Sequence, residues 1–420
     1  MMKVKRLKMQ SFRGIGDLTL DFDETSPTVL IGINGVGKSS ILDCLAILLS
    51  HLISRSQFDI SAERFFREDD IKNKYKKTHN QITILLLSRQ LTWSLTTPRK
   101  QKTTEISNDL TELLAAIEDD DIYEQLEADE NTNIPLAVYY PVNRAVFDIP
   151  LKIKEDIAQL YLYAYDEALT GISVNFGHLF QWFREREDLE NEERRDNPAH
   201  RDKQLEAVRQ AIYSLIPDFY NLRVRRSPLR MTVQKQREEL IVNQLSDGEK
   251  CLLAMVGDLA RRLAIANPSL PDPLLGDGVV LIDEIELHLH PKWQREIIPA
   301  LTRTFPNCQF IVTTHSPQVI SQVKPEGIYI LEKTDEGVVA KRPESSFGRD
   351  SNRILEDLMG VPERPQEIKE SLLELFRLID AGNIEGARQL RQQLANEIGA
   401  DEPEFVKADV LIRRKEILNR

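Results

Sequence analysis

The chain has 420 residues, of which 41% are hydrophobic, and it carries a formal net charge of −12 with a pI of about 5.3. This length is enough for one large or two ordinary domains, and the hydrophobic content is enough for a sizeable core. Proteins that only coat nucleic acid are usually basic, so the charge excludes that class and leaves nucleic-acid contact to a local patch at most.

Cysteine usage and hydropathy indicate where the protein is found. Cys44, Cys251 and Cys308 lie far apart in apolar surroundings, so we expect buried thiols in a reducing compartment and not a disulfide framework or a zinc site. No apolar run is long enough to span a bilayer. The first nine residues alternate lysines with apolar residues, which is a strand pattern and not a signal peptide. We therefore expect a cytoplasmic protein without membrane contact.

The beginning of the chain predicts three strands, at residues 3–9, 16–23 and 28–31. A turn containing Phe12, Arg13 and Gly14 joins the first two. The third strand is a short buried run that leads directly into a glycine-rich loop, and an apolar helix is expected over residues 40–49. Strand, loop and helix follow one another without a gap.

The glycine-rich loop fits the phosphate-binding pattern G-x-x-x-x-G-K-[ST]. An ordinary glycine-rich turn would not need the preceding strand and the following helix, so we expect a nucleoside triphosphate to bind here. The glycines let backbone N–H groups face the phosphates, and the helix N-terminus adds a partial positive charge. Lys38 is expected to reach the β- and γ-phosphates, and the Ser39 hydroxyl to bind Mg²⁺. The predicted nucleotide-binding residues of the loop are Gly32, Asn34, Gly35, Gly37, Lys38, Ser39 and Ser40.

The middle of the chain predicts strands followed by helices. A hairpin is expected at residues 81–87 and 91–95, and a return strand at 137–140. Residues 105–132 are acidic and predict a solvated helical insertion. Residues 151–215 are expected to be helical throughout.

Two charged segments stand out in this region. Residues 180–195 carry Glu and Arg at helical spacing, which we interpret as an exposed helix stabilised by ion pairs and not as a catalytic segment. A second hairpin is expected at 222–226 and 229–233. It carries Arg223, Arg225, Arg226 and Arg230.

A helix start with two interpretations follows at residues 245–250, before an apolar helix over 251–266. The structural interpretation is a capping box, with Ser246 as N-cap and Glu249 three residues later. The functional interpretation adds that Ser246 and the backbone of Gly248 present donors to a phosphate at a helix N-terminus.

A buried strand over residues 278–282 ends in Asp283 and Glu284, which is the Walker B pattern. Asp283 is expected to hold Mg²⁺ through water, and Glu284 to orient and polarise the attacking water. His288 and His290 follow, and a metal pair is disfavoured because no cysteine or third histidine lies nearby. A further buried strand begins at Phe310 and ends at His315, about 31 residues after Glu284.

The order and spacing of these segments resemble the head of ABC-type ATPases, and more closely its SMC/RecF-like branch. Residues 245–250 resemble the LSGGQ signature, with Asp247 and Glu249 as departures that occur in this branch. The resemblance implies ATP and Mg²⁺ as cofactors, His315 as the γ-phosphate sensor, and a homodimer of ATP-bound heads in which each signature helix caps the other subunit's nucleotide. Gln81 is a candidate for the family's Q-loop glutamine.

The resemblance also implies an α/β fold: a P-loop NTPase of the ABC-ATPase head type, with a helical insertion and a helical C-terminal tail. We expect the head's first part over residues 1–100, the insertion over 101–220 and the head's second part over 221–345. The tail, 346–420, is a candidate docking segment for a partner.

Residues 182–192 and 347–355 look like segments of bacterial anti-phage ATPases of the PtuA type, from Septu and retron systems. That family implies an oligomeric regulatory ATPase that controls a separately encoded HNH nuclease of the PtuB type. The alternative is an autonomous RecF-like DNA-repair ATPase, which tight DNA binding by the isolated chain would favour. A transporter subunit is disfavoured by the Phe12-Arg13-Gly14 turn and by residues 286–291, which look like the SMC/RecF-like branch.

Overall fold

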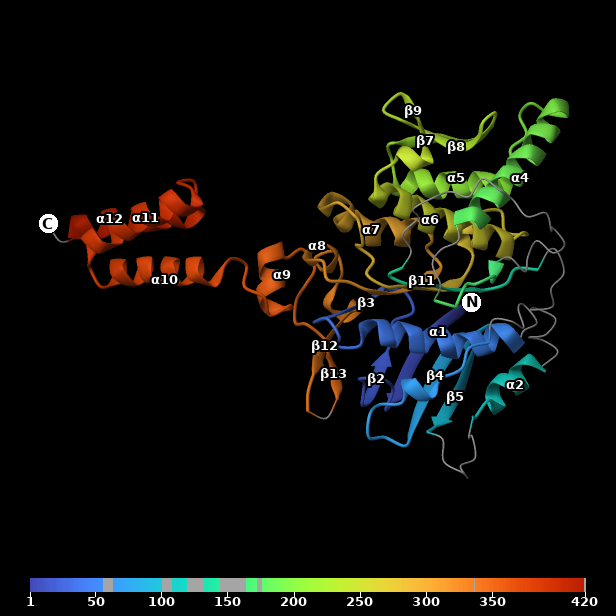
Figure 1. Cartoon of the computed structure of the whole chain (residues 1–420), viewed down its shortest axis with the longest axis horizontal. Helices are drawn as coiled ribbons and strands as arrows, with labels where there is room; N and C mark the ends of the chain where they lie inside the picture. The colour runs from blue at the N-terminus through green and yellow to red at the C-terminus, as the bar shows by residue number, and fades with distance from the viewer. Residues whose placement is uncertain are drawn as a thin grey trace. The chain divides into compact units, whose positions relative to one another are not determined.

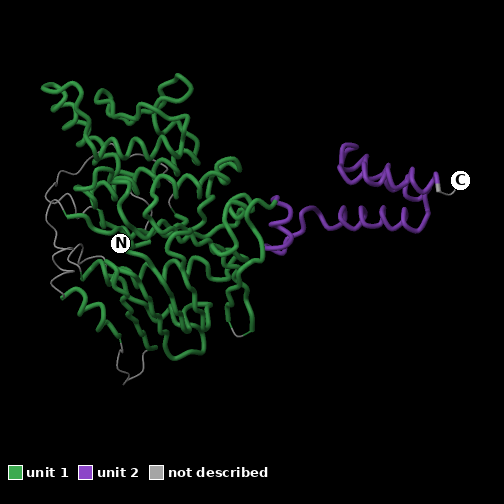
Figure 2. The backbone as a smooth tube through the Cα atoms, turned by 180° about the vertical axis from the view of Figure 1, so that it is seen from behind, with its two compact units in different colours: residues 1–349 green, residues 350–420 purple. Residues whose placement is uncertain are grey.

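The computed structural model of the chain describes residues 1–55, 63–99, 108–118, 132–143, 164–171, 176–335 and 337–418. Within it the chain divides into two units, Met1–Arg349 and Asp350–Arg420, which Figure 2 colours green and purple. Each unit has its own apolar interior.

An antiparallel sheet forms one layer of the first unit, with strand order β2-β1-β4-β5. The alternation of apolar and polar residues along these strands places one face in the core and the other in solvent. The two N-terminal strands and the first hairpin are confirmed. The strands are β1 (Met2–Gln10), β2 (Asp17–Asp21), β4 (Lys77–Leu86) and β5 (Arg89–Pro98).

A six-stranded sheet forms the centre of the unit, in the order β13-β12-β3-β11-β10-β6. All its neighbours pair in parallel except β12 and β13. The inner strands are apolar at nearly every position and buried on both faces, as parallel sheets require. The strands are β3 (Thr28–Gly32), β6 (Leu136–Tyr140), β10 (Gly278–Ile282), β11 (Cys308–Thr313), β12 (Ile328–Lys333) and β13 (Val338–Lys341).

Helix α1 (Lys38–Arg55) lies between the two sheets and contacts both (Figure 1). The indole N–H of Trp93, on β5, donates to the carbonyl of Leu48 in this helix at 3.1 Å. The buried side chain of Gln309, on β11, bonds the backbone N–H and C=O of Val4 at 2.7 and 2.9 Å. The first contact holds α1 against the antiparallel sheet, and the second joins the two sheets directly.

Helices cover the opposite face of the parallel sheet (Figure 1). Helix α6 (Asp247–Ala266) packs on α5 (Lys203–Leu215) and α4 (Phe176–Asp196), and α7 (Pro291–Thr304) packs on α5. Beyond them lies a small antiparallel sheet of β7 (Phe219–Arg226), β8 (Leu229–Lys235) and β9 (Glu238–Ile241). The predicted second hairpin is therefore confirmed, and β9 is an additional strand.

Two expectations for the middle of the chain were wrong in part. Residues 164–171 are turns and not helix, because the buried guanidinium of Arg262 binds the backbone carbonyls of Ala164 and Asp166 at 2.7 and 2.9 Å. The charged helix α4 is not simply exposed, since its Glu187 and Glu190 are buried and paired with arginines of other elements. Residues 105–107, 119–131, 151–163 and 172–175, also expected to be helical, lie outside the described part.

Short elements complete the first unit. Helix α2 (Thr111–Ile117) packs on β5, and α8 (Pro317–Ile320) packs on α7. Short 3-10 turns follow at η2 (Glu68–Asp70), η4 (Val242–Gln244), η5 (Pro273–Leu275) and η6 (Pro325–Gly327). The three cysteines are free and buried, as expected.

The second unit is helical, as expected for the tail: α9 (Ser351–Asp357), α10 (Gln366–Asp380), α11 (Ile384–Ile398) and α12 (Pro403–Leu418). The last three pack around an apolar cluster that includes Leu375, Leu394 and Phe405. Among all helices in the described ranges, none is both long and apolar enough to cross a membrane.

Candidate nucleotide site

Three adjacent strands of the central sheet end at the same edge. In the parallel register Leu30 of β3 lies opposite Thr313 of β11, and Val312 of β11 lies opposite Ile282 of β10. The chain leaves β3 into the glycine-rich loop, β10 into Asp283 and Glu284, and β11 toward His315. The fold therefore gathers these three predicted segments at one carboxyl edge, where ligands bind in open α/β sheets.

The backbone of the glycine-rich loop needs glycine at three positions. Gly32, Gly35 and Gly37 have φ values of +148°, +76° and +111°, which side chains rarely adopt. A Cβ on Gly32 would lie 2.5 Å from the carbonyl oxygen of Leu331, and one on Gly37 would lie 3.0 Å from Cγ1 of Ile15. Asn34, Gly35 and Ser39 are exposed and Ser40 is half-buried, so the loop presents its inner face to solvent.

The amine of Lys38 lies inside this loop. Its Nζ donates to the carbonyls of Gly32 at 2.9 Å and Ile33 at 3.2 Å. Burial lowers the pKa of Lys38, opposed by the charges of Asp283, Glu284 and Glu286. A charged phosphate is a stronger acceptor than a carbonyl, so an entering phosphate would draw this amine from the loop carbonyls.

The side chain of Thr313 is hydrogen-bonded to both acidic residues that follow β10, Asp283 and Glu284. Its hydroxyl donates to Oδ1 of the buried Asp283 at 2.6 Å and accepts from the backbone N–H of Glu284 at 2.7 Å. Glu284 has a φ of +45°, which for a non-glycine residue is uncommon and is found at functional sites. The Glu284 side chain is half-buried.

Glu286 connects the loop after Asp283 with the loop that carries His315. Its carboxylate accepts from the backbone N–H of His315 at 2.5 Å and from the hydroxyl of Thr314 at 2.7 Å. The hydroxyl of Ser316, the N-cap of α8, donates to Oε1 of Gln294 at 2.7 Å. The position of His315 is therefore fixed by hydrogen bonds on both sides.

The predicted capping box is present at the start of α6. The Glu249 carboxylate accepts from the backbone N–H of Ser246 at 3.0 Å and from its hydroxyl at 2.8 Å. A Cβ on Gly248 would lie 2.4 Å from the carbonyl oxygen of His288, so only glycine fits beneath residues 286–291. Ser246 and Asp247 are exposed, so this helix N-terminus is open to a second molecule.

Gln81 is not brought to the carboxyl edge. It lies in the middle of β4, opposite Lys8 and Ser94 in the antiparallel sheet. At the edge itself, the chain leaves β6 through Tyr140, whose carbonyl accepts from the N–H of Asp283 at 2.9 Å, and reaches the exposed Asn143. Asn143 therefore follows the strand that pairs with β10, whereas Gln81 lies within the antiparallel sheet.

A further network of ion pairs joins the N-terminal turn to α1. The Arg13 guanidinium pairs with Asp43 of α1 and with Asp70 at 2.8 Å, and Arg64 pairs with Asp43 at 2.6 Å. Sequence reasoning missed it because these residues are 21 to 57 positions apart.

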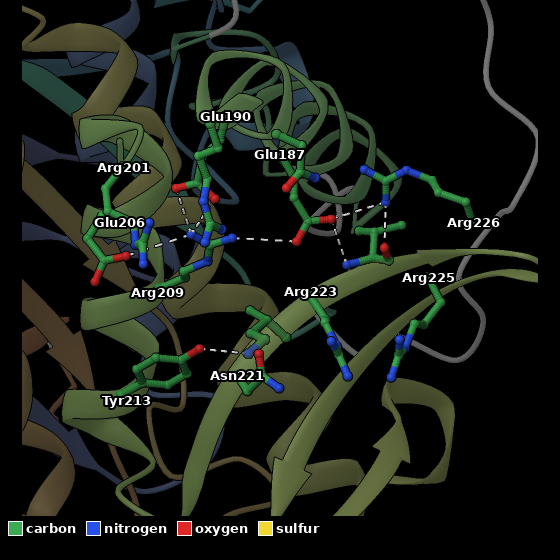
Figure 3. A pocket seen from close by; sticks show the side chains of 14 residues that line it. Glu187, Glu190, Arg201, Glu206, Arg209, Tyr213, Asn221, Arg223, Arg225 and Arg226 are labelled. Carbon is green, nitrogen blue, oxygen red and sulfur yellow. Dashed lines mark hydrogen bonds and ion pairs between the residues drawn. The ribbon is translucent and has the colours of Figure 1, made fainter. Parts of the chain in front are cut away.

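The cluster of charged side chains around β7 forms a cavity of about 670 Å³ (Figure 3). None of the predicted nucleotide-binding residues lines it. Arg209 pairs with Glu190 at 3.0 Å and Glu187 at 3.5 Å, and Arg223 and Arg225 share Glu239, each at 2.6 Å. Most of its arginines are therefore engaged by carboxylates, and a nucleic-acid phosphate would have to compete with them.

The two histidines after Glu284 have separate positions. His290 caps α7, with its Nδ1 accepting from the backbone N–H of Lys292 at 3.2 Å. Exposed His288 has a φ of +62°. In the described ranges, no group of three or more His, Cys, Asp or Glu side chains is placed to hold a metal ion.

The chain matches a family model described as "AAA domain" over residues 6–220, and a second AAA-domain model over residues 174–321. It is similar to the Retron Ec83 probable ATPase of Escherichia coli, with 32% identity over 99% of this chain and 87% of that protein. It is similar to the Retron Vc95 probable ATPase of Vibrio cholerae serotype O1 biovar El Tor, with 31% identity over 89% and 82%.

Similarity extends to the Septu protein PtuA of Bacillus thuringiensis, with 23% identity over 92% of this chain and 91% of that protein. Among solved structures, an Smc head domain from Pyrococcus furiosus has 16% identity and a TM-score of 0.47, covering 82% of this chain and 96% of that one. The chain is therefore an AAA-type P-loop ATPase of the family that includes the Retron Ec83 and Vc95 probable ATPases.

Proposed function

We propose that the chain is the ATP-binding and ATP-hydrolysing regulatory subunit of a bacterial anti-phage defence complex, and that it controls a separately encoded HNH-type nuclease. The relatives support the defence context, because their names place them in retron and Septu systems. The observation that carries the ATPase part is the hydroxyl of Thr313, which joins Asp283 and the backbone of Glu284 at the edge where the glycine-rich loop begins.

The residues at this edge fit ATP and Mg²⁺. The positive-φ glycines and the start of α1 form a cradle for phosphates, and Lys38 would contact the β- and γ-phosphates. Ser39 and Asp283 would hold Mg²⁺, which, when bound, neutralises charge on the phosphates. Glu284 would orient and polarise the attacking water, and His315 would contact the γ-phosphate.

The second half of the site is proposed to come from another copy of the chain. Ser246 is exposed at the start of α6, and its helix N-terminus favours an anion through its partial positive charge. A γ-phosphate between this end and the glycine-rich loop of a second chain would favour the dimer only when ATP is bound.

The nuclease is proposed to dock on the tail unit. The helices of the tail unit enclose their own apolar cluster. Removing these helices should therefore leave the core of the first unit intact. Deletion of residues 360–420 should abolish co-purification with a neighbouring HNH protein and leave ATP affinity unchanged. Retention of the partner by the truncated chain would place docking elsewhere, and loss of ATP binding would show that the head itself was damaged.

A further inference from the structure

The carboxylate of Glu249, in the first turn of α6, is buried and accepts hydrogen bonds on both oxygens. Its Oε2 accepts from the backbone N–H of Ser246 at 3.0 Å and from the Ser246 hydroxyl at 2.8 Å. Its Oε1 accepts from the ammonium of Lys235, which ends β8. A capping box needs only the contacts between Ser246 and Glu249, so the ion pair with Lys235 is an addition to it.

The hydroxyl of Ser246 has one proton, and that proton points to Glu249. A serine hydroxyl donates one hydrogen bond, and here the Glu249 carboxylate receives it. In the shared site proposed above, the same hydroxyl would lie beside the γ-phosphate bound by a second chain. It can donate to that phosphate only after it turns from the carboxylate. The strength with which Glu249 accepts this bond therefore decides how readily Ser246 reaches the phosphate.

Glu249 also carries a negative charge close to the proposed phosphate position. Burial raises the pKa of Glu249, but the hydrogen bonds from Lys235 and Ser246 outweigh burial and lower the pKa, so the carboxylate is ionised at neutral pH. An ionised carboxylate without a cation would repel a nearby γ-phosphate. It would also hold the Ser246 hydroxyl in a stronger, charge-assisted bond. The ammonium of Lys235 reduces both effects.

The other acidic residue in the first turn of α6 does not depend on a cation from another element. Asp247 pairs with Lys250 of the same helix at 2.9 Å, and its side chain is 75% exposed, so solvent screens its charge. Glu249 is only 4% exposed, and its cation comes from β8, where the β8–β9 hairpin holds Lys235 at the last position of the strand. The charge of Glu249 is therefore balanced from outside the helix.

We propose that Lys235 is a positioning residue of the ATP site. Its ammonium balances the charge of Glu249, so that Ser246 can turn its hydroxyl to the γ-phosphate bound by a second chain. This inference rests on the shared site of the proposed function. Lys235 acts through Glu249 and need not touch the nucleotide, and its place on β8 links the β7-β8-β9 sheet to the half-site that closes over ATP.

The first test is dimerisation of the full chain with Mg²⁺ and a non-hydrolysable ATP analogue, measured by sedimentation. Lys235→Met removes the ammonium and keeps most of the aliphatic stem, so it should weaken the analogue-dependent dimer by about tenfold or more. Affinity of the single chain for the analogue, measured by calorimetric titration at low protein concentration, should be unchanged. Arg237→Met removes a positive charge from an exposed position in the same hairpin and should behave like wild type.

A second change separates charge balance from a simple tie between β8 and α6. Glu249→Gln, added to Lys235→Met, removes the carboxylate charge that has lost its partner, while the amide oxygen can still accept from Ser246. The double variant should recover most of the lost dimerisation, and Lys235→Arg, which keeps the charge, should retain it. If Lys235 only ties the two elements together, the double variant should be no better than Lys235→Met, because the tie is absent from both.

Ser246→Arg shows whether a negative result concerns Lys235 or the shared site. If Ser246→Arg abolishes the analogue-dependent dimer but Lys235→Met dimerises like wild type, the role of Lys235 is wrong and the shared site stands. Absence of recovery in the Lys235→Met, Glu249→Gln variant would likewise overturn the charge-balance role alone. If Ser246→Arg itself dimerises like wild type, the shared site is wrong, and the inference about Lys235 is overturned with it.

Discussion

The hydroxyl of Tyr140 donates a hydrogen bond to the carboxylate of Asp258 across 3.0 Å in the core of the first unit. Tyr140 ends β6, and its own carbonyl accepts from the N–H of Asp283. Asp258 lies on α6, the helix that begins after Ser246. A single tyrosine therefore connects the loop that carries Asp283 and Glu284 to α6.

The buried charges around Asp258 should make stability depend on acid pH. Burial raises the pKa of Asp258, but the charges of Arg262 and Arg261 outweigh it and lower the pKa to about 2. The ionised Asp258 should contribute its full stabilisation to the folded state above the unfolded pKa of about 4. This contribution should disappear as the pH falls toward about 2, which lowers the free energy of unfolding by on the order of 2 kcal/mol.

Asp258→Asn measures how much the charge of the Asp258 carboxylate contributes to stability. It leaves Arg261 and Arg262 buried beside a neutral amide, so at pH 7 the free energy of unfolding of the first unit should fall by about 3–5 kcal/mol. Tyr140→Phe, the milder control, should cost about 1 kcal/mol. Urea unfolding at pH 7 and pH 3 measures both. If the gap between wild type and Asp258→Asn does not narrow at pH 3, the carboxylate charge is not the cause.

Thr313→Val should slow ATP hydrolysis by about fivefold or more, with little change in fold. It keeps the side-chain volume but removes the hydroxyl that donates to Asp283 and accepts from Glu284, a loss of about 1–3 kcal/mol in this buried position. Phosphate release at saturating ATP is the measurement. Thr313→Ser keeps the hydroxyl and should retain most activity; equal activity of the Val and Ser variants would argue against this role.

Lys38→Ala should weaken binding of a non-hydrolysable ATP analogue at least tenfold, which corresponds to about 1.4 kcal/mol or more. The physical reason is loss of the one amine held inside the phosphate loop. Calorimetric titration measures the change, and Lys8→Ala, which removes the same charge from the exposed face of β1, is the control. Unchanged affinity in Lys38→Ala would refute the assignment.

Glu284→Gln should keep ATP affinity and lose hydrolysis by about 100-fold or more, because the amide retains the shape but cannot act as a base. The variant should accumulate the nucleotide-bound form, which filter binding with labelled ATP detects. Glu296→Gln, an exposed change on α7, should behave like wild type. Normal phosphate release by Glu284→Gln would assign water activation to another residue.

Most of the strands, loops and caps that surround the candidate nucleotide site could be predicted from the sequence, because each is formed by residues close together in the chain. The strands before Gly32 and Asp283, and the helix cap at Ser246, each depend on residues within a few positions. Contacts between segments far apart in the chain leave no local sequence pattern from which they could be predicted. The hydroxyl of Thr313 meets Asp283 across 30 residues, and Glu187 of α4 meets Arg226 across 39. Turns at residues 164–171 replaced predicted helix because Arg262, nearly 100 residues away, binds their carbonyls.

Mixed dimers test most directly the proposal that α6 of a second chain completes the ATP site. Lys38→Ala damages the phosphate loop, and Ser246→Arg damages the signature side, so either homodimer has two defective sites. In a mixed dimer both defects fall in one site and the other is intact. The two variants, co-expressed with different tags and purified through both, should trap ATP well above either parent. Trapping no greater than that of the parents would contradict a shared site and leave Ser246 as a helix cap alone.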